Sequence, residues 1–88
     1  MAARPFRCSV EGVQCIAIMG PDSVVLDFVG YGERVEIAYE EIRCVREDSG
    51  MVRIEAARDD KPLAYRVRSR SAKRLHRAVI DAVRDWTA

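Results

Sequence analysis

The chain has 88 residues, 49% of them hydrophobic and 33% charged, with a formal net charge of +1 at pH 7. This length allows one domain with a modest core, and the composition is that of a folded globular protein. The small net charge argues against non-specific nucleic-acid binding. No apolar run approaches the roughly 20 residues of a membrane-spanning helix, and the first residues lack the apolar stretch of a signal peptide.

Short segments that alternate apolar and polar residues fill the chain up to residue 68, separated by turn residues. Phe6, Cys8 and Val10 alternate with Arg7 and Ser9, for example, which predicts a half-buried strand. In chain order, strands are predicted at residues 6–10, 13–19, 23–29, 34–39, 42–46, 51–57 and 63–68. Glycine, proline or acidic residues between these segments predict tight turns. We expect residues 1–5 to form a tail and residues 6–86 to form a single domain.

Residues 71–86 carry apolar side chains at intervals of three and four, which places these side chains on one face of a helix. This face consists of Ala72, Leu75, Val79, Ala82, Val83 and Trp86. Ser71 is the predicted N-cap, with Ser69 as the alternative. Since the preceding chain is predicted to form strands, the helix should cover the sheet, with Leu75 and Trp86 buried against it.

The three cysteines, Cys8, Cys15 and Cys44, lie within apolar strand patterns and show no C-x-x-C spacing. An odd number without that spacing argues against a disulfide framework and against a zinc site. Free cysteine in such a pattern packs as a small hydrophobic residue. We therefore expect no metal, no cofactor and a reducing compartment, which indicates a cytoplasmic protein.

Seven consecutive antiparallel strands followed by one helix predict a mainly β fold, a partly open barrel or sandwich that the helix caps. This layout is similar to the pleckstrin-homology-like (PH-like) superfold. Residues 39–43 (YEEIR) resemble the aromatic-x-Glu-Ile-Arg corner in the C-terminal lobe of FERM domains, and residues 72–75 (AKRL) resemble the start of the helix that ends this lobe. Phosphotyrosine-binding (PTB) domains share the layout.

The resemblance implies a protein-interaction module in which an extended peptide pairs with the fifth strand and lies against the C-terminal helix. The corresponding groove residues are Ile42, Arg43, Cys44, Val45, Arg46, His76, Val79, Ile80 and Val83. Ile80 lies beside the apolar face of the helix, so it either lines the groove or widens the core contact. The expected partner is a protein or peptide, with no role for nucleic acid.

Basic residues without an intervening acidic residue gather around the start of the helix: Arg66, Arg68, Arg70, Lys73, Arg74 and Arg77. One interpretation is a site for a phosphoinositide or another anionic membrane surface, which would place the protein peripherally at membranes. The interpretation that we favour is a solvated face that pairs with acidic turns. A third interpretation makes the chain a structural lobe of a larger protein, with no ligand of its own.

The sequence indicates no catalytic residues. His76 is the only histidine, and no nucleophile or carboxylate stands at a spacing that would bring it to the imidazole. General-base and nucleophilic catalysis both require such partners. We therefore expect the protein not to be an enzyme.

Overall fold

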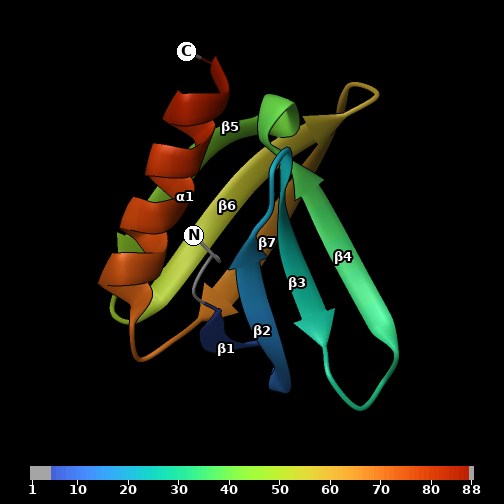
Figure 1. Cartoon of the computed structure of the whole chain (residues 1–88), viewed down its shortest axis with the longest axis vertical. Coiled ribbons are helices and arrows are strands. Elements are labelled where there is room, and N and C mark those ends of the chain that lie inside the picture. Colours follow the sequence, from blue (N-terminus) through green and yellow to red (C-terminus); the bar gives the residue numbers. More distant parts are fainter. Residues whose placement is uncertain (1–4, 88) are drawn as a thin grey trace.

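The computed structural model describes residues 5–87, and the first four residues of the predicted tail lie outside this range (Figure 1). The strands are β1 (Phe6–Val10), β2 (Val13–Met19), β3 (Ser23–Phe28), β4 (Glu33–Ala38), β5 (Ile42–Asp48), β6 (Met51–Arg58) and β7 (Lys61–Arg68). A short 3-10 helix, η1 (Tyr39–Glu41), separates β4 from β5, and the helix α1 (Ala72–Thr87) follows β7. The predicted mainly β fold with one C-terminal helix is confirmed. No helix among the described residues is long and apolar enough to cross a membrane.

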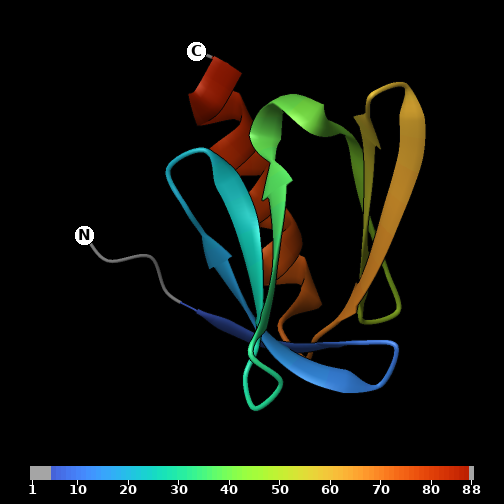
Figure 2. The same ribbon diagram turned by 90° about the vertical axis from the view of Figure 1, so that its right-hand side faces the viewer.

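The strands form one antiparallel sheet in the order β4-β3-β2-β1-β7-β6-β5, so that β4 and β5 are its free edges. β1 and β2 pair along their length, whereas β1 and β7 are joined by the single residue pair Ser9 and Arg68. We call this weak junction the seam. Figure 2 shows that the sheet opens on either side of the seam and that α1 lies across the opening. The layout is consistent with the PH-like fold.

Two-residue turns set the register of three hairpins, β1–β2, β5–β6 and β6–β7. Glu11-Gly12, Ser49-Gly50 and Asp59-Asp60 all have positive φ at both residues. This is the type I′ geometry, whose twist matches that of paired strands. Because such a turn closes on a hydrogen-bonded pair, the pairs that follow alternate between non-hydrogen-bonded and hydrogen-bonded.

This alternation determines where the backbone of β5 points. Asp48 and Met51 close the β5–β6 turn, and Val45 lies opposite Ile54 at a non-hydrogen-bonded position of the same ladder. The amide and carbonyl of Val45 therefore point away from β6, toward the free edge of the sheet. The same rule explains Pro62, which has no N–H and lies opposite Ala57 at a non-hydrogen-bonded position.

The core lies between the two parts of the sheet and α1. Its largest fully buried side chains are Leu26, Ile37, Ile54, Leu75, Val24, Val52, Val67 and Val79. The prediction for Leu75 is confirmed, since only 1% of it is exposed. The prediction for Trp86 is wrong, because 45% of this residue is exposed. The last turn of α1 runs past the end of the sheet (Figure 1), where the Trp86 ring lies beside the Tyr39 ring, with centroids 6.4 Å apart.

Tyr39 ties the tip of the β2–β3 hairpin to η1. Its hydroxyl donates to the Gly20 carbonyl at 2.6 Å, and its amide donates to the Asp22 carbonyl at 3.0 Å. A side chain at residue 20 would bring its Cβ to 3.0 Å from the Ser23 carbonyl oxygen, so glycine suits this close approach. Burial raises the pKa of the Tyr39 hydroxyl, and the nearby Asp22 charge raises it further.

The two serines before α1 have different roles. Ser71 directly precedes the helix, and its carbonyl accepts from the Leu75 amide at 2.8 Å. The Ser69 hydroxyl accepts from the Ser71 amide at 3.1 Å and donates to the Arg7 carbonyl at 2.8 Å. Ser69 thus links the approach to α1 with β1 and reinforces the seam.

Leu75→Ala should lower the free energy of unfolding by about 2–5 kcal/mol, because it leaves a cavity in the fully buried face of α1. Ile80→Ala on the same helix should cost about 1 kcal/mol or less, since Ile80 lies partly exposed and outside the buried core cluster. Urea denaturation of both variants measures the difference. An unchanged midpoint for Leu75→Ala would show that α1 does not hold the sheet together.

Candidate functional site

The free edge of β5 and the adjacent flank of α1 form the first candidate site, which we call the β5 edge site. His76 Nε2 lies 3.1 Å from the Val45 carbonyl oxygen, the oxygen that points to this edge. Ile80 follows His76 by one helical turn and therefore lies on the same flank. Ile80 is partly exposed and is not among the side chains packed against the core cluster, whereas Val45 and Val83 are.

The structure separates the predicted groove residues into three groups. Val79 is fully buried and Ile42 is 9% exposed, so both belong to the core. Arg43 and Arg46 are exposed, and Cys44 is half-buried. The remaining predicted residues, Val45, His76, Ile80 and Val83, are all partly exposed and make up the β5 edge site.

A register shift between Ile42 and Cys44 explains the division within β5, because the bulge places Val45 opposite Ile54, a core residue. The exposed arginines of β5 make local contacts. Arg43 Nη1 donates to the Glu40 carbonyl at 2.8 Å, and Arg46 Nε donates to Cys44 Sγ at 3.3 Å. Neither contact covers the β5 backbone edge.

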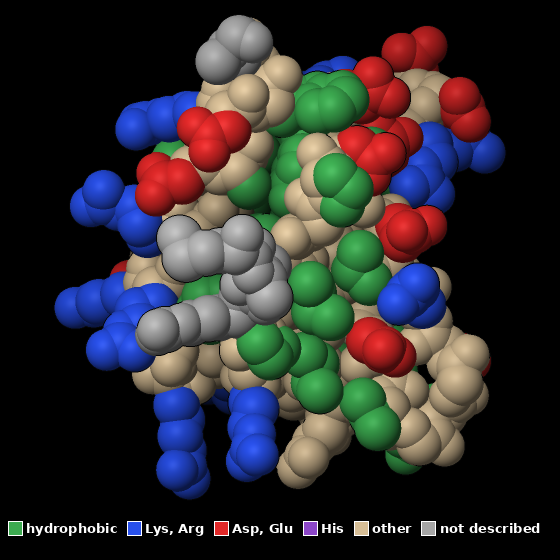
Figure 3. Space-filling view, in the orientation of Figure 1, with side chains coloured by type: hydrophobic (Ala, Val, Ile, Leu, Met, Phe, Trp, Pro, Cys, Tyr) green, Lys and Arg blue, Asp and Glu red, His purple; other side chains and the backbone are tan. Residues whose placement is uncertain are grey.

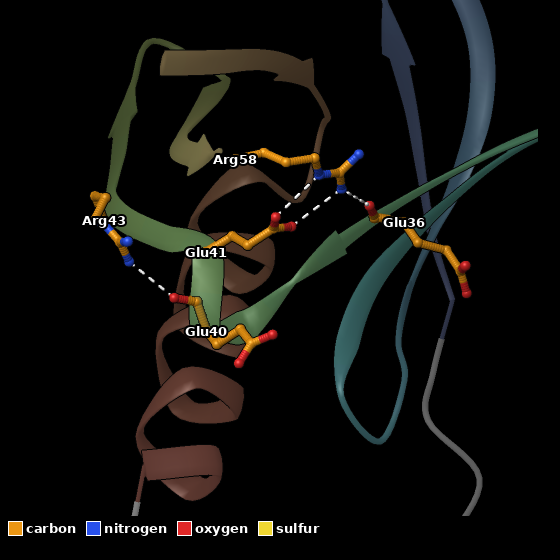
Figure 4. A network of polar contacts seen from close by, with 5 residues as sticks. All are labelled: Glu36, Glu40, Glu41, Arg43 and Arg58. Carbon is orange, nitrogen blue, oxygen red and sulfur yellow. Dashed lines mark hydrogen bonds and ion pairs between the residues drawn. The ribbon is translucent and has the colours of Figure 1, made fainter. Parts of the chain in front are cut away.

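The corner before β5 is held by an ion pair that the sequence did not predict. The Arg58 guanidinium donates to both carboxylate oxygens of Glu41, from Nε to Oε2 at 3.0 Å and from Nη2 to Oε1 at 3.1 Å (Figure 4). Its Nη2 also donates to the Glu36 carbonyl at 3.3 Å. The Arg58 hydrogen bonds hold the pKa of Glu41 below its usual value. This contact joins β4, η1 and the end of β6, and it positions the start of β5.

The predicted basic cluster is also divided. Arg68, Arg70 and Arg74 line a hollow of about 1070 Å³ at the seam, together with Arg7. Lys73 lines a smaller neighbouring hollow of about 510 Å³. Arg66 and Arg77 are exposed but line neither hollow. Arg7 was missed at the sequence level, because only the non-local contact between β1 and the approach to α1 brings it to this place.

Cys8 and Cys15 lie directly opposite each other on β1 and β2, with their Sγ atoms 3.0 Å apart. Burial, and next the hydrogen bond with Cys15, raises the pKa of the Cys8 thiol to about 12. All three cysteines are free thiols. Within residues 5–87, no three side chains of His, Cys, Asp or Glu gather in a way that would hold a metal ion.

Comparisons with known proteins add no family to this description. No family model matches the chain, and no curated protein was found to match it. The class defined by the structure is therefore that of the fold, a seven-stranded antiparallel sheet with a C-terminal helix.

Cys8 should resist alkylation by iodoacetamide at pH 8 in the folded protein. Because burial and the hydrogen bond with Cys15 raise the pKa of this thiol to about 12, far less of it is present as the reactive thiolate at this pH than for a thiol with the ordinary pKa of 9.0. Peptide mass spectrometry of folded and urea-unfolded protein should show labelling of Cys8 only after unfolding. Equal labelling rates in the two states would contradict the packed thiol pair.

Proposed function

We propose that the protein is a non-catalytic interaction module that binds an extended polypeptide segment at the β5 edge site. The observation that carries the proposal is the position of Ile80, an apolar side chain outside the core that stands beside a backbone edge without a strand partner.

The backbone of β5 offers donors and acceptors in the pattern that another strand requires. Val45 and Glu47 both occupy non-hydrogen-bonded positions of the β5–β6 ladder, so their amides and carbonyls point outward. A free strand edge of this kind is a template for one more strand. An extended segment that pairs here gains main-chain hydrogen bonds that do not depend on its sequence.

The flank of α1 supplies the selective part of the site. Ile80 and Val83 present partly exposed apolar surface next to the edge, and Val45 continues this surface on β5. Burial of such surface contributes roughly 25 cal/mol per Å² to binding, before the costs of association. An apolar side chain of the bound segment would therefore be the main determinant of specificity.

His76 covers the edge in the unbound protein. Its hydrogen bond to the Val45 carbonyl occupies the acceptor that a bound strand would use. The bound segment would displace the imidazole and replace one hydrogen bond with another, which costs little net free energy. The engagement of this sole histidine with a main-chain carbonyl also supports a non-catalytic role.

The resemblance to the FERM C-terminal lobe and to PTB domains agrees with this proposal, since such domains bind extended segments between the fifth strand and the helix. A selection from a peptide library with phosphorylated and unphosphorylated members would provide a ligand for the variants below. It would also show whether a phosphate group is required.

Ile80→Glu should weaken the selected peptide by about 1–3 kcal/mol, because it places a charge against the apolar surface of the ligand. Val45→Pro should also weaken it, because it removes an outward amide but no bond to β6. Both variants should remain folded by circular dichroism. Calorimetric titration measures the affinities.

Two control variants test whether the loss of peptide affinity arises at the outward-facing backbone of β5. Arg46→Pro removes an amide that faces β6 at a hydrogen-bonded pair, so it should unfold the hairpin where Val45→Pro does not. His76→Ala removes the competitor for the Val45 carbonyl, so peptide affinity should stay equal or rise. If Ile80→Glu and Val45→Pro both fold and bind with wild-type affinity, the partner docks on another face and strand addition is wrong.

A further inference from the structure

The hollow at the seam is separate from the β5 edge site and has a distinct composition. It is bounded by β1 and β2 on one side and by the connection between β7 and α1 on the other, with a volume of about 1070 Å³. Among residues 5–87, four arginines line it, Arg7, Arg68, Arg70 and Arg74, and no acidic residue does. We call it the seam hollow.

The positive charge of the seam hollow is not neutralised within the described residues. Two ion pairs are found among these residues, Arg53 with Glu55 and Arg58 with Glu41, and neither includes any of the four arginines of the hollow. Figure 3 shows basic side chains gathered along the left and lower border of the molecule, away from most of the acidic ones. The net charge of +1 therefore conceals an uneven distribution, and like charges that line one hollow attract an anion.

The start of α1 adds uncharged donors to this charge. The first helical hydrogen bond runs from the Leu75 amide to the Ser71 carbonyl, which leaves the amides of residues 72–74 without acceptors in the helix. Such amides and the helix dipole favour an anion at this end. Ser9 and Ser71 also line the seam hollow, and Arg74 projects from the first turn of the helix.

The seam hollow also has an apolar side. Phe6, Ile16 and Val29 line it, and Val29 is 62% exposed. Tyr31, two residues further along the β3–β4 loop, is 70% exposed. Large exposed side chains on one loop beside a basic hollow are suited to the boundary of a lipid bilayer, where a tyrosine keeps its hydroxyl in water and its ring in the apolar layer.

We propose that the seam hollow binds a phosphomonoester, with its phosphate held by Arg7, Arg68, Arg70 and Arg74. A guanidinium group can donate two parallel hydrogen bonds to the oxygens of a phosphate, and a dianion neutralises more of the positive charge of the four arginines than a carboxylate does. The volume leaves room for the organic group that carries the phosphate. The exposed Val29 and Tyr31 indicate that the phosphomonoester belongs to a lipid headgroup and not to a free metabolite.

The test uses two probes and two variants that change the net charge equally. The probes are glycerol 3-phosphate in solution and phosphatidylcholine vesicles that contain phosphatidic acid, both in about 0.15 M salt, where screening acts over about 8 Å. The hollow variant is Arg70→Gln with Arg74→Gln. The matched control is Arg66→Gln with Arg77→Gln, two arginines outside the hollow.

The hollow variant should bind phosphatidic acid vesicles about tenfold more weakly or worse, because it loses charge-assisted hydrogen bonds to phosphate. The control should stay within about threefold of wild type. Glycerol 3-phosphate should shift the NMR amide signals of Ser9 and Ser71. Tyr31→Ser should weaken vesicle binding and leave these shifts unchanged, which would identify a lipid as the source.

Binding of glycerol 3-phosphate without binding of vesicles would support the site and make a free metabolite its ligand. An equal loss in the hollow variant and in the control would reveal diffuse attraction to a basic surface and overturn the proposal. The absence of binding to both probes would overturn it as well. Neither result bears on peptide binding at the β5 edge site, because the two sites share no residue.

Discussion

The packing of α1 into the opening of the sheet is the interaction on which the rest of the structure depends. At the seam, the two parts of the sheet are joined by one residue pair between β1 and β7, and the Ser69 hydrogen bond to β1 reinforces this junction. Leu26 on one part and Ile54 on the other are buried in one core cluster together with Leu75 and Val79 of the helix. Full burial of one such side chain is worth roughly 1.5–3 kcal/mol, which is a large share of the stability of a small domain.

The same helix organises both candidate sites at different turns. Its first turn carries Arg74 to the seam hollow, and its next turns carry His76 and Ile80 to the edge of β5. The buried positions Leu75 and Val79 lie between these functional positions in the sequence, so the core contact sets the orientation of both surfaces. A change that rotates or shifts the helix would therefore alter both sites together.

Local sequence patterns predicted the elements well because their causes are local. The strand at residues 6–10 has the predicted bounds, and the helix begins and ends within one residue of the prediction, since alternation, turn residues and the absence of a break in the helical pattern are all short-range signals. The positive φ values at Glu11 and Ser49 fall in turns that these residues were expected to form. The predicted face of α1 places Leu75 correctly for the same reason.

What the sequence did not reveal depends on contacts between distant segments. Arg7 joins the seam hollow only because β1 meets the chain that follows β7. Trp86 fits the apolar period of the helix, yet it is exposed because the sheet ends before the helix does. Val79 is buried in the core and Ile80 lies outside it, a division that depends on how the helix packs against the sheet and that no periodicity within the helix determines.

Hydrogen exchange of the β5 amides, followed by NMR on the unbound protein, tests the central claim most directly, namely that this strand presents an unpaired backbone edge. The register makes the amides of Cys44 and Arg46 donors to β6, whereas those of Val45 and Glu47 point outward. We expect Val45 and Glu47 to exchange orders of magnitude faster than their two neighbours, since only paired amides require the sheet to open. Equally slow exchange at all four residues would mean that the edge is already covered and would contradict the account.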